Sequence, residues 1–216
     1  MKVLLVGNGG REHAIARALV RTSTPEHPVA LVVQAGNPAL EQLGRSLTMD
    51  PLDPSENVDL VVVGPEAPLV AGVADAVLDY GIPVFGPTKG AARLEASKSF
   101  AKEIMADAGV ATARSFTCTT MEEVSAAFDE LGAPHVVKDD ALAAGKGVVV
   151  TSDREEASAH ARACLARDGG AVVVEDYLDG PEVSLFCVAD GETVVPLQPA
   201  QDFKRVGDGN EGPNTG

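Results

Sequence analysis

The sequence contains no tryptophan, and only 4% of its 216 residues are aromatic. A core cannot therefore be built around large rings. It must consist of valine, leucine, isoleucine and alanine, as is typical of β-rich runs that alternate with alanine-rich helices. The sequence also lacks a signal peptide and any apolar run that approaches the length of a transmembrane helix. We therefore expect a cytoplasmic protein that does not associate with membranes.

Cysteine and positive charge are both scarce. The three cysteines, Cys118, Cys164 and Cys187, form no CxxC pair and have no metal-ligand spacing, so we interpret them as small apolar residues in a reducing compartment. Lysine and arginine number 17 against 32 acidic residues, which gives a net charge of −15. Such a chain does not neutralise a phosphate backbone broadly, which argues against nucleic acid as a partner. A phosphate-bearing ligand would have to be held locally, by lysines, arginines, backbone N–H groups or a metal ion.

The first part of the chain alternates continuous apolar runs with helical patterns. Such runs are typical of buried parallel strands. Strands are expected within residues 3–7, 29–38, 59–64 and 82–87, and helices over residues 11–21 and 70–80. This order predicts an α/β fold with a small doubly wound parallel sheet.

From about residue 90 the pattern changes to that of a small α+β unit, followed by the start of a larger sheet. Helices are expected over residues 91–109, 121–132 and 153–167, and strands within residues 112–120, 135–140, 147–151, 171–191 and 192–205. The strands 135–140 and 147–151 should form an antiparallel pair. Thr119 or Thr120 should cap the helix over residues 121–132. The last residues, 206–216, are turn formers with no strand to return to, which predicts a fragment of a longer protein.

The segment GNGGREHA (residues 7–14) follows the first expected strand and opens the first helix. Its backbone N–H groups and the helix dipole favour an anion there. The dinucleotide fingerprint G-x-G-x-x-G nearly fits, but Glu12 occupies the third glycine position and the second strand ends in Gln34 rather than in an acid, which disfavours NAD. A phosphate or phosphosugar site and a tight turn without a ligand both remain open. We interpret His13 as a packing or capping residue of this helix.

Two further segments carry candidate binding groups. GPEAPL (residues 64–69) lies at the carboxyl end of the third expected strand, where open α/β sheets bind ligands; Glu66 is either a hydrogen-bond acceptor for an amine or ribose hydroxyls, or an exposed acid in a turn. KDDALAAGKGVVV (residues 138–150) is not a Walker A motif, because a glycine follows Lys146 and a strand follows that glycine. It is either a hairpin with an exposed lysine or a strand–loop–strand phosphate loop in which Lys138 and Lys146 act as point charges.

Four acids follow the run of valines near residue 173. They are Glu175, Asp176, Asp179 and Glu182. They are either exposed charges at a strand edge, or the acceptor edge and the carboxylate that an adenine ring and a ribose require.

Taken in order, these segments are recognisable. The motifs are G-N-G-G-R-E-H-A, G-P-E-A-P-L, G-P-T, S-K-x-F-A-K, K-x-D-x-L-A-A-G-K-G-V, E-x-x-L-x-G-x-E-x-S and G-P-N-T-G. Together they closely resemble the phosphoribosylamine–glycine ligase (glycinamide ribonucleotide synthetase) family of the ATP-grasp superfamily, and the resemblance covers the whole chain. It implies the ATP-dependent ligation of glycine to 5-phosphoribosylamine in de novo purine biosynthesis. The products are glycinamide ribonucleotide, ADP and phosphate, and glycyl phosphate is the intermediate.

The resemblance also implies a domain order. Residues 1–97 would form a phosphoribosylamine-binding domain that precedes the ATP-grasp part. Residues 98–172 would contain the first ATP-grasp helix and the lid subdomain, and residues 173–216 would begin an incomplete ATP-grasp core.

Site residues follow from the same resemblance. Lys98 (or Lys102) and Lys138 would contact the ATP phosphates beneath a lid formed by Gly145, Lys146 and Gly147. Glu175 and the Leu178 backbone would meet adenine, and Glu182 the ribose. The residues implied for the substrates are Gly9, Gly10, Glu66, Asp208, Pro213, Asn214 and Thr215. The ligands of Mg²⁺ (or Mn²⁺) are expected beyond Gly216, and no catalytic residue is assigned.

One departure from the family pattern is Ala141, which stands where the family has a glycine. If the backbone there has a positive φ, alanine would cost roughly 1–2 kcal/mol and impair closure over ATP. Two other functions stay open, namely a truncated, non-catalytic module that binds a nucleotide or phosphosugar, and another ATP-grasp ligase that joins a carboxylate to a different amine. The sequence does not determine the oligomeric state, and a monomer is compatible with it.

Overall fold

The computed structural model describes residues 1–47, 57–142, 147–201 and 205–214. Its contacts divide the chain into two compact units, Met1–Val110 and Ala111–Gly216. No helix in the described part of the chain is long and apolar enough to cross a membrane.

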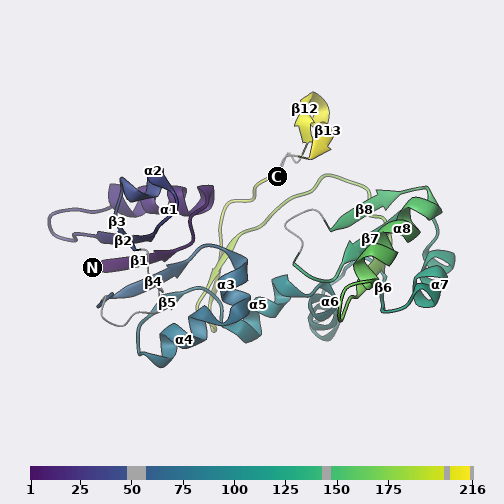
Figure 1. The fold of residues 1–216 in the computed structure, drawn as a ribbon, viewed down its shortest axis with the longest axis horizontal. Coiled ribbons are helices and arrows are strands. Elements are labelled where there is room, and N and C mark those ends of the chain that lie inside the picture. Colours follow the sequence, from purple (N-terminus) through teal and green to yellow (C-terminus); the bar gives the residue numbers. More distant parts are fainter. Residues whose placement is uncertain (48–56, 143–146, 202–204, 215–216) are drawn as a thin grey trace. The chain divides into compact units, whose positions relative to one another are not determined.

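The first unit is built on a five-stranded parallel sheet with the order β3-β2-β1-β4-β5 (Figure 1). Its strands are β1 (Lys2–Val6), β2 (Ala30–Gln34), β3 (Arg45–Leu47), β4 (Leu60–Val63) and β5 (Val84–Phe85). The predicted doubly wound parallel sheet is confirmed. Strand β3 is an addition to the four expected strands, because its sequence, RSL, has no apolar run and it lies at the sheet edge.

Helices cover both faces of this sheet. The helices of this unit are α1 (Gly10–Arg21), α2 (Pro38–Glu41), α3 (Glu66–Ala71), α4 (Val73–Asp79), α5 (Lys89–Ala96) and α6 (Lys98–Asp107), and the first five of them contribute to the core clusters on the sheet. In β1, Val3 and Leu5 pack in the cluster that includes Ala16 of α1, whereas Leu4 and Val6 pack in the cluster that includes residues of α3, α4 and α5. Burial on both faces explains why the central strands consist of continuous apolar residues.

Two helices predicted as continuous are each broken in two. The expected helix 70–80 is interrupted at Gly72, whose φ of 102° ends α3 and precedes α4. The expected helix 91–109 is interrupted at Ser97, which is extended and whose Oγ accepts a hydrogen bond from the Phe100 N–H at 3.1 Å. A serine that caps α6 in this way competes with continuation of α5.

The second unit contains a four-stranded antiparallel sheet with the order β6-β9-β7-β8. Its elements are β6 (Ser115–Cys118), α7 (Met121–Leu131), β7 (His135–Asp139), β8 (Val148–Thr151), α8 (Arg154–Leu165) and β9 (Val172–Glu175). Residues of α7 and α8 pack with Val137 and Val174 in one core cluster. Cys118 and Cys164 are buried in this cluster, as expected, whereas Cys187 is exposed. The predicted antiparallel pair of β7 and β8 is confirmed.

The remainder of the second unit forms two hairpins. Strands β10 (Cys187–Ala189) and β11 (Val194–Pro196) pair antiparallel, and so do β12 (Arg205–Gly207) and β13 (Glu211–Asn214). The prediction that residues 206–216 contain no strand is therefore wrong. The turn formers at Asp208–Asn210 reverse the chain between two short strands, so they make a hairpin rather than only a loop.

Thr120, rather than Thr119, caps α7. The Thr120 hydroxyl accepts a hydrogen bond from the Glu123 N–H at 3.2 Å, and the Glu123 carboxylate accepts one from the Thr119 N–H at 2.7 Å. The hydrogen bonds that the carboxylate accepts from the Thr119 N–H, the Thr119 hydroxyl and the Thr120 N–H lower the pKa of Glu123. The contribution of this carboxylate to stability is therefore present above its ordinary pKa and is lost as the pH falls through the lowered value.

We expect Thr120→Ala to lower the free energy of unfolding by about 1 kcal/mol, because it leaves a helix N–H group without its side-chain acceptor. Thr119→Ala is the matched control and should cost less, because the Thr119 hydroxyl makes an exposed bond to Glu123 and does not cap the helix. Urea unfolding followed by circular dichroism measures both. Equal losses would contradict the assignment of the cap.

Candidate functional site

The glycine-rich segment after β1 is held by a buried carboxylate. Glu12 is only 4% exposed, and it accepts a hydrogen bond from the Gly9 N–H at 2.5 Å. It also lies against the loop that follows β4, where a Cβ on Gly64 would come within 2.1 Å of its Oε1. Gly7 has a φ of 107°, and a Cβ there would be 2.6 Å from the Pro65 ring. Glu12 therefore packs between the two loops, which explains why an acid takes the third glycine position of the fingerprint.

Arg11 joins the same two loops on the exposed side. Its NH1 donates hydrogen bonds to the Gly64 carbonyl at 2.7 Å and to Glu66 Oε1 at 2.9 Å. The pKa of Glu66 lies below its ordinary value, chiefly because its own backbone N–H donates to the carboxylate, while burial acts in the opposite direction and Arg11 adds to the lowering. Glu66 is therefore ionised at neutral pH.

The structure brings three of the expected substrate residues, Gly9, Gly10 and Glu66, to one edge of the sheet. Because the Gly9 N–H is engaged by Glu12, the donor groups of the helix N-terminus begin at Gly10, the first residue of α1. Sequence reasoning missed Arg11. Its position beside the glycines was a signal, but its contact with Glu66 depends on how the chain folds. A cation, a helix N-terminus and a carboxylate together suit a ligand with an anionic group and hydrogen-bond donors.

Lys138 and Glu175 lie on one face of the four-stranded sheet. The register pairs Lys138 of β7 with Val173 of β9, so Glu175, two residues further along β9, is the diagonal neighbour of Lys138. The Lys138 ammonium forms an ion pair with Glu175 Oε1, and the Glu175 side chain is 9% exposed. Because Val137 and Val174 face α7 and α8, this ion pair lies on the opposite face. Two residues expected at a nucleotide are thus in contact.

The other expected residues are distributed over several elements. Lys98 and Lys102 lie on α6 of the first unit, and Gly147 directly precedes β8. Leu178 and Glu182 are exposed in the segment after β9. Asp208 lies in the turn between β12 and β13, and Pro213 and Asn214 lie in β13. Gly145, Lys146 and Thr215 lie outside the described residues.

One acid near the expected nucleotide site has a structural partner. Asp176 accepts hydrogen bonds from Arg114 Nε at 3.0 Å and from Arg114 NH2 at 3.3 Å. Its own backbone N–H donates to the Arg114 carbonyl. We therefore assign Asp176 to the packing of the segment before β6 against the end of β9.

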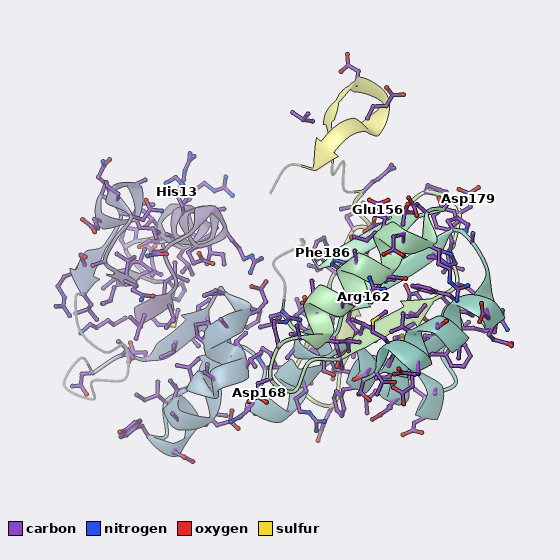
Figure 2. All side chains as sticks on the ribbon, turned by 45° about the vertical axis from the view of Figure 1, so that its right-hand side comes forward. His13, Glu156, Arg162, Asp168, Asp179 and Phe186 are labelled. Atoms are coloured by element: carbon purple, nitrogen blue, oxygen red, sulfur yellow. The ribbon has the colours of Figure 1, made fainter. Side chains whose placement is uncertain are left out.

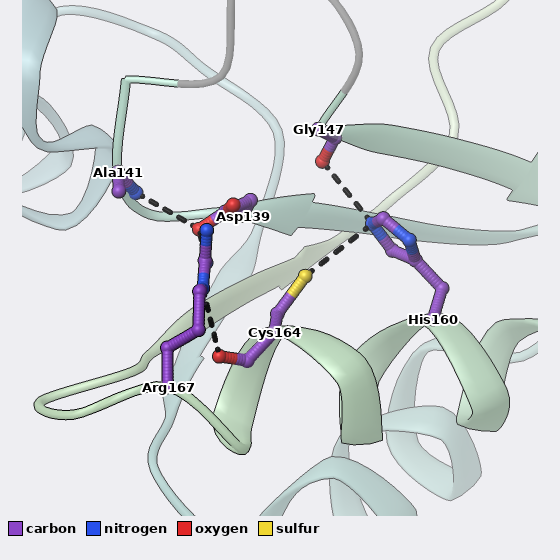
Figure 3. Close-up of polar contacts among 6 residues, drawn as sticks. All are labelled: Asp139, Ala141, Gly147, His160, Cys164 and Arg167. Carbon is purple, nitrogen blue, oxygen red and sulfur yellow. Dashed lines mark hydrogen bonds and ion pairs between the residues drawn. The ribbon is translucent and has the colours of Figure 1, made fainter.

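Helix α8 brings together a cysteine and a histidine. The Cys164 Sγ lies 3.7 Å from His160 Nε2, and the same nitrogen lies 3.2 Å from the Gly147 carbonyl oxygen (Figure 3). Burial raises the pKa of the Cys164 thiol, and Asp139 raises it further, while Arg167 opposes the shift. The thiol is therefore neutral at pH 7, and the pair does not form the thiolate that a nucleophilic cysteine requires.

Comparison with known families identifies the family to which the chain belongs. The model of the phosphoribosylglycinamide synthetase N domain matches residues 1–95, and the model of the ATP-grasp (A) domain of the same family matches residues 96–216. The chain belongs to the phosphoribosylglycinamide synthetase family. The resemblance expected from the motifs is thereby confirmed.

Individual relatives agree with this assignment. The phosphoribosylamine–glycine ligase of Streptomyces coelicolor is 59% identical over 224 aligned residues, and that of Escherichia coli O6:H1 is 46% identical over 228. Both alignments cover all of this chain, but they cover 52% and 53% of the two relatives. The chain thus spans about half the length of the curated relatives it matches.

Solved structures give the same fold. The phosphoribosylamine–glycine ligase of Thermotoga maritima superposes with a TM-score of 0.84 at 30% identity, over 100% of this chain and 54% of that chain. An N5-carboxyaminoimidazole ribonucleotide synthetase, solved as its ADP complex, superposes with a TM-score of 0.71 at 18% identity, over 97% of this chain and 55% of that chain. The second likeness shows that the fold extends beyond the phosphoribosylglycinamide synthetase family.

In this family member, the strain expected at Ala141 does not arise. Among the described residues, Asn57 is the one non-glycine residue with a positive φ. The condition for the predicted cost at Ala141 is therefore not met. Its backbone N–H instead donates to Asp139 Oδ1 at 3.1 Å, which is the geometry of a turn closed by an aspartate side chain.

A metal site was expected outside this chain. Within the described ranges, no three His, Cys, Asp or Glu side chains are grouped closely enough to hold a metal ion. We therefore assign no metal ligand to these residues.

Proposed function

We propose that this chain takes part in the ATP-dependent ligation of glycine to 5-phosphoribosylamine, which gives glycinamide ribonucleotide, ADP and phosphate in purine biosynthesis. The observation that carries this proposal is the arrangement of Arg11, Glu66 and the start of α1 at one sheet edge, in the part that matches the family's N domain. A phosphosugar amine carries an anion and donors that suit these groups.

Each group has a proposed role. Gly9, Gly10, Arg11 and Glu66 hold phosphoribosylamine, together with Asp208, Pro213, Asn214 and Thr215. Lys138, with Lys98 or Lys102, contacts the ATP phosphates beneath Gly145, Lys146 and Gly147. Glu175 and the Leu178 backbone meet adenine, and Glu182 meets the ribose. The substrate domain comprises residues 1–97. The first ATP-grasp helix and the lid subdomain comprise residues 98–172, and the ATP-grasp core begins with residues 173–216.

The proposed reaction has two steps. A carboxylate oxygen of glycine attacks the γ-phosphorus of ATP, ADP leaves, and glycyl phosphate forms. The amine of phosphoribosylamine then attacks the acyl carbon, and phosphate leaves with the bonding electrons while the amine loses a proton. Lysines near the phosphates offset the negative charge that shifts toward the leaving group, and the acyl phosphate must be kept from water.

We also propose that Mg²⁺ or Mn²⁺ accompanies ATP and that the reaction takes place in the cytoplasm. Because the described residues offer no group of three metal ligands, no step is assigned to the metal. A cytoplasmic location agrees with the scarcity of cysteine and the lack of paired cysteine spacing.

The test is ADP formation from Mg-ATP with glycine and freshly made phosphoribosylamine, each varied in turn. We expect ADP formation to require both. Glu66→Gln should raise the KM for phosphoribosylamine by about tenfold, because it removes a charged acceptor, and should leave the affinity for ATP unchanged. Glu95→Gln, an exposed acid on α5, is the matched control and should behave like the parent.

Two other results would select the other functions. ADP formation that depends on a different carboxylate or amine would assign the chain to another ATP-grasp ligase. ATP binding without any turnover in the presence of both substrates would favour a non-catalytic nucleotide-binding module.

A further inference from the structure

The end of β7 and the residue before β8 are tied together at the backbone. The Asp139 N–H donates to the Gly147 carbonyl at 2.7 Å, one step beyond the last strand pair, Lys138 with Val148. This bond fixes the separation of the two strands at the point where the chain leaves one and enters the other.

Helix α8 and the residues after it hold the Asp139 end. The Asp139 side chain is 5% exposed and forms an ion pair with Arg167 NH2 through Oδ1. The Arg167 Nε donates to the Cys164 carbonyl at 3.3 Å, which attaches the guanidinium to the last turn of α8 (Figure 3). Asp139 Oδ1 also accepts the Ala141 N–H, so one carboxylate oxygen links α8 to the first turn beyond β7.

The same helix holds the Gly147 end. His160 Nε2 lies 3.2 Å from the Gly147 carbonyl oxygen. A carbonyl oxygen can only accept, so Nε2 carries the proton and Cys164 Sγ, 3.7 Å away, lies beside an N–H group. Both the neutral Nε2–H tautomer and the imidazolium can donate this bond, so it does not depend on the protonation of the ring.

Lys138 is the residue directly before Asp139. Because side chains alternate along a strand, the Asp139 side chain points to the α8 face while Lys138 points to the opposite face, where it pairs with Glu175. A shift or rotation of the end of β7 would therefore move the Lys138 ammonium as well.

We propose that Arg167 and His160 are positioning residues, which act from α8 and the segment directly after it, through Asp139 and Gly147, to set where Lys138 presents its charge to the phosphates of a nucleotide. The proposal rests on the proposed function for its ligand, ATP, and on the described contacts for its geometry. Two residues on the side of the sheet that α8 covers would thus influence the affinity for ATP on the opposite side of the sheet.

The test compares Arg167→Gln with Arg162→Gln in the full chain. Arg162 is the matched control, since it is an exposed arginine on α8 (Figure 2), five residues before Arg167, and it pairs with Glu155 at 3.3 Å. We expect Arg167→Gln to weaken Mg-ATP binding by about tenfold by calorimetry, and to change the affinity for adenosine, which lacks phosphates, by less than about twofold. His160→Leu should act in the same direction, and His160→Gln, which retains an N–H donor, should recover most of the loss.

A second readout does not need a nucleotide. Amide hydrogen exchange at Asp139 reports the bond to Gly147, and it should become about tenfold faster in Arg167→Gln and stay unchanged in Arg162→Gln. Unchanged exchange, or equal loss of ATP and adenosine affinity, would overturn the positioning role. If exchange at Asp139 is faster in Arg167→Gln but the parent chain binds no ATP, the role of Arg167 at the strand ends is supported, and the proposed nucleotide function is overturned instead.

Discussion

Gly64→Ala is expected to lower the free energy of unfolding of the first unit by about 2–4 kcal/mol. The added Cβ would lie 2.1 Å from Glu12 Oε1 and 2.7 Å from its Cδ, so the carboxylate must move. Glu12 is buried and its carboxylate accepts the Gly9 N–H, so a displaced carboxylate would lose this bond without reaching water. The penalty arises from steric exclusion and a broken hydrogen bond, since Gly64 does not have a positive φ.

Gly10→Ala is the matched control, because a Cβ at Gly10 would meet nothing within 4 Å. It should change stability by less than about 0.5 kcal/mol. Urea unfolding followed by circular dichroism gives both values. In the double variant Glu12→Ala/Gly64→Ala the clash is removed, so the combined loss should be smaller than the sum of the single losses. Equal stability of Gly64→Ala and Gly10→Ala would contradict the packing of Glu12 between the two loops.

Lys138→Met is expected to weaken ATP binding by about 10- to 100-fold, the loss of one charge-assisted hydrogen bond to phosphate. It should also destabilise the second unit, because it removes the ion pair between Lys138 and the largely buried Glu175 carboxylate. Calorimetry with Mg-ATP and thermal unfolding of the free chain measure the two effects separately. Lys89→Met, which removes an exposed lysine from α5, is the control for the loss of one positive charge.

The double variant Lys138→Met/Glu175→Gln separates the two roles of the lysine. Because it removes the carboxylate charge as well, it should recover much of the stability lost in Lys138→Met, but not the affinity for ATP. If the double variant binds ATP as well as Glu175→Gln alone, Lys138 serves only as the structural partner of Glu175, and its proposed contact with phosphate is wrong.

The elements that the sequence predicts well are those buried along their whole length. Strands β1 and β4 are covered on both faces, so their apolar runs are continuous and mark them clearly. The breaks at Gly72 and Ser97 were missed because the helical spacing of apolar residues continues through both positions. Strand β3 was missed for the opposite reason, since an edge strand of three residues needs no apolar run.

At the candidate site too, some features follow from local sequence patterns, whereas others depend on contacts between distant parts of the chain. The two loops that carry Gly10 and Glu66 could be placed at one edge of the sheet from the sequence, because each follows a predicted strand at the edge where parallel sheets bind ligands. The contact of Arg11 with Glu66 joins residues 55 positions apart, and that of Arg167 with Asp139 joins residues 28 apart. The contact of Lys138 with Glu175 depends on the register of β7 and β9. None of these three pairings has a local pattern that would predict it.

The distribution of the three cysteines allows thiol modification to report on the opening of the second unit alone. All of them follow residue 110, so the first unit contributes no thiol. Cys187 is exposed, whereas Cys118 and Cys164 are buried, and burial raises the pKa of Cys118 to about 11. A thiol-specific reagent will therefore modify Cys187 first and reach the other two only when the second unit opens. The rate of that later modification records the opening of one unit without any signal from the other.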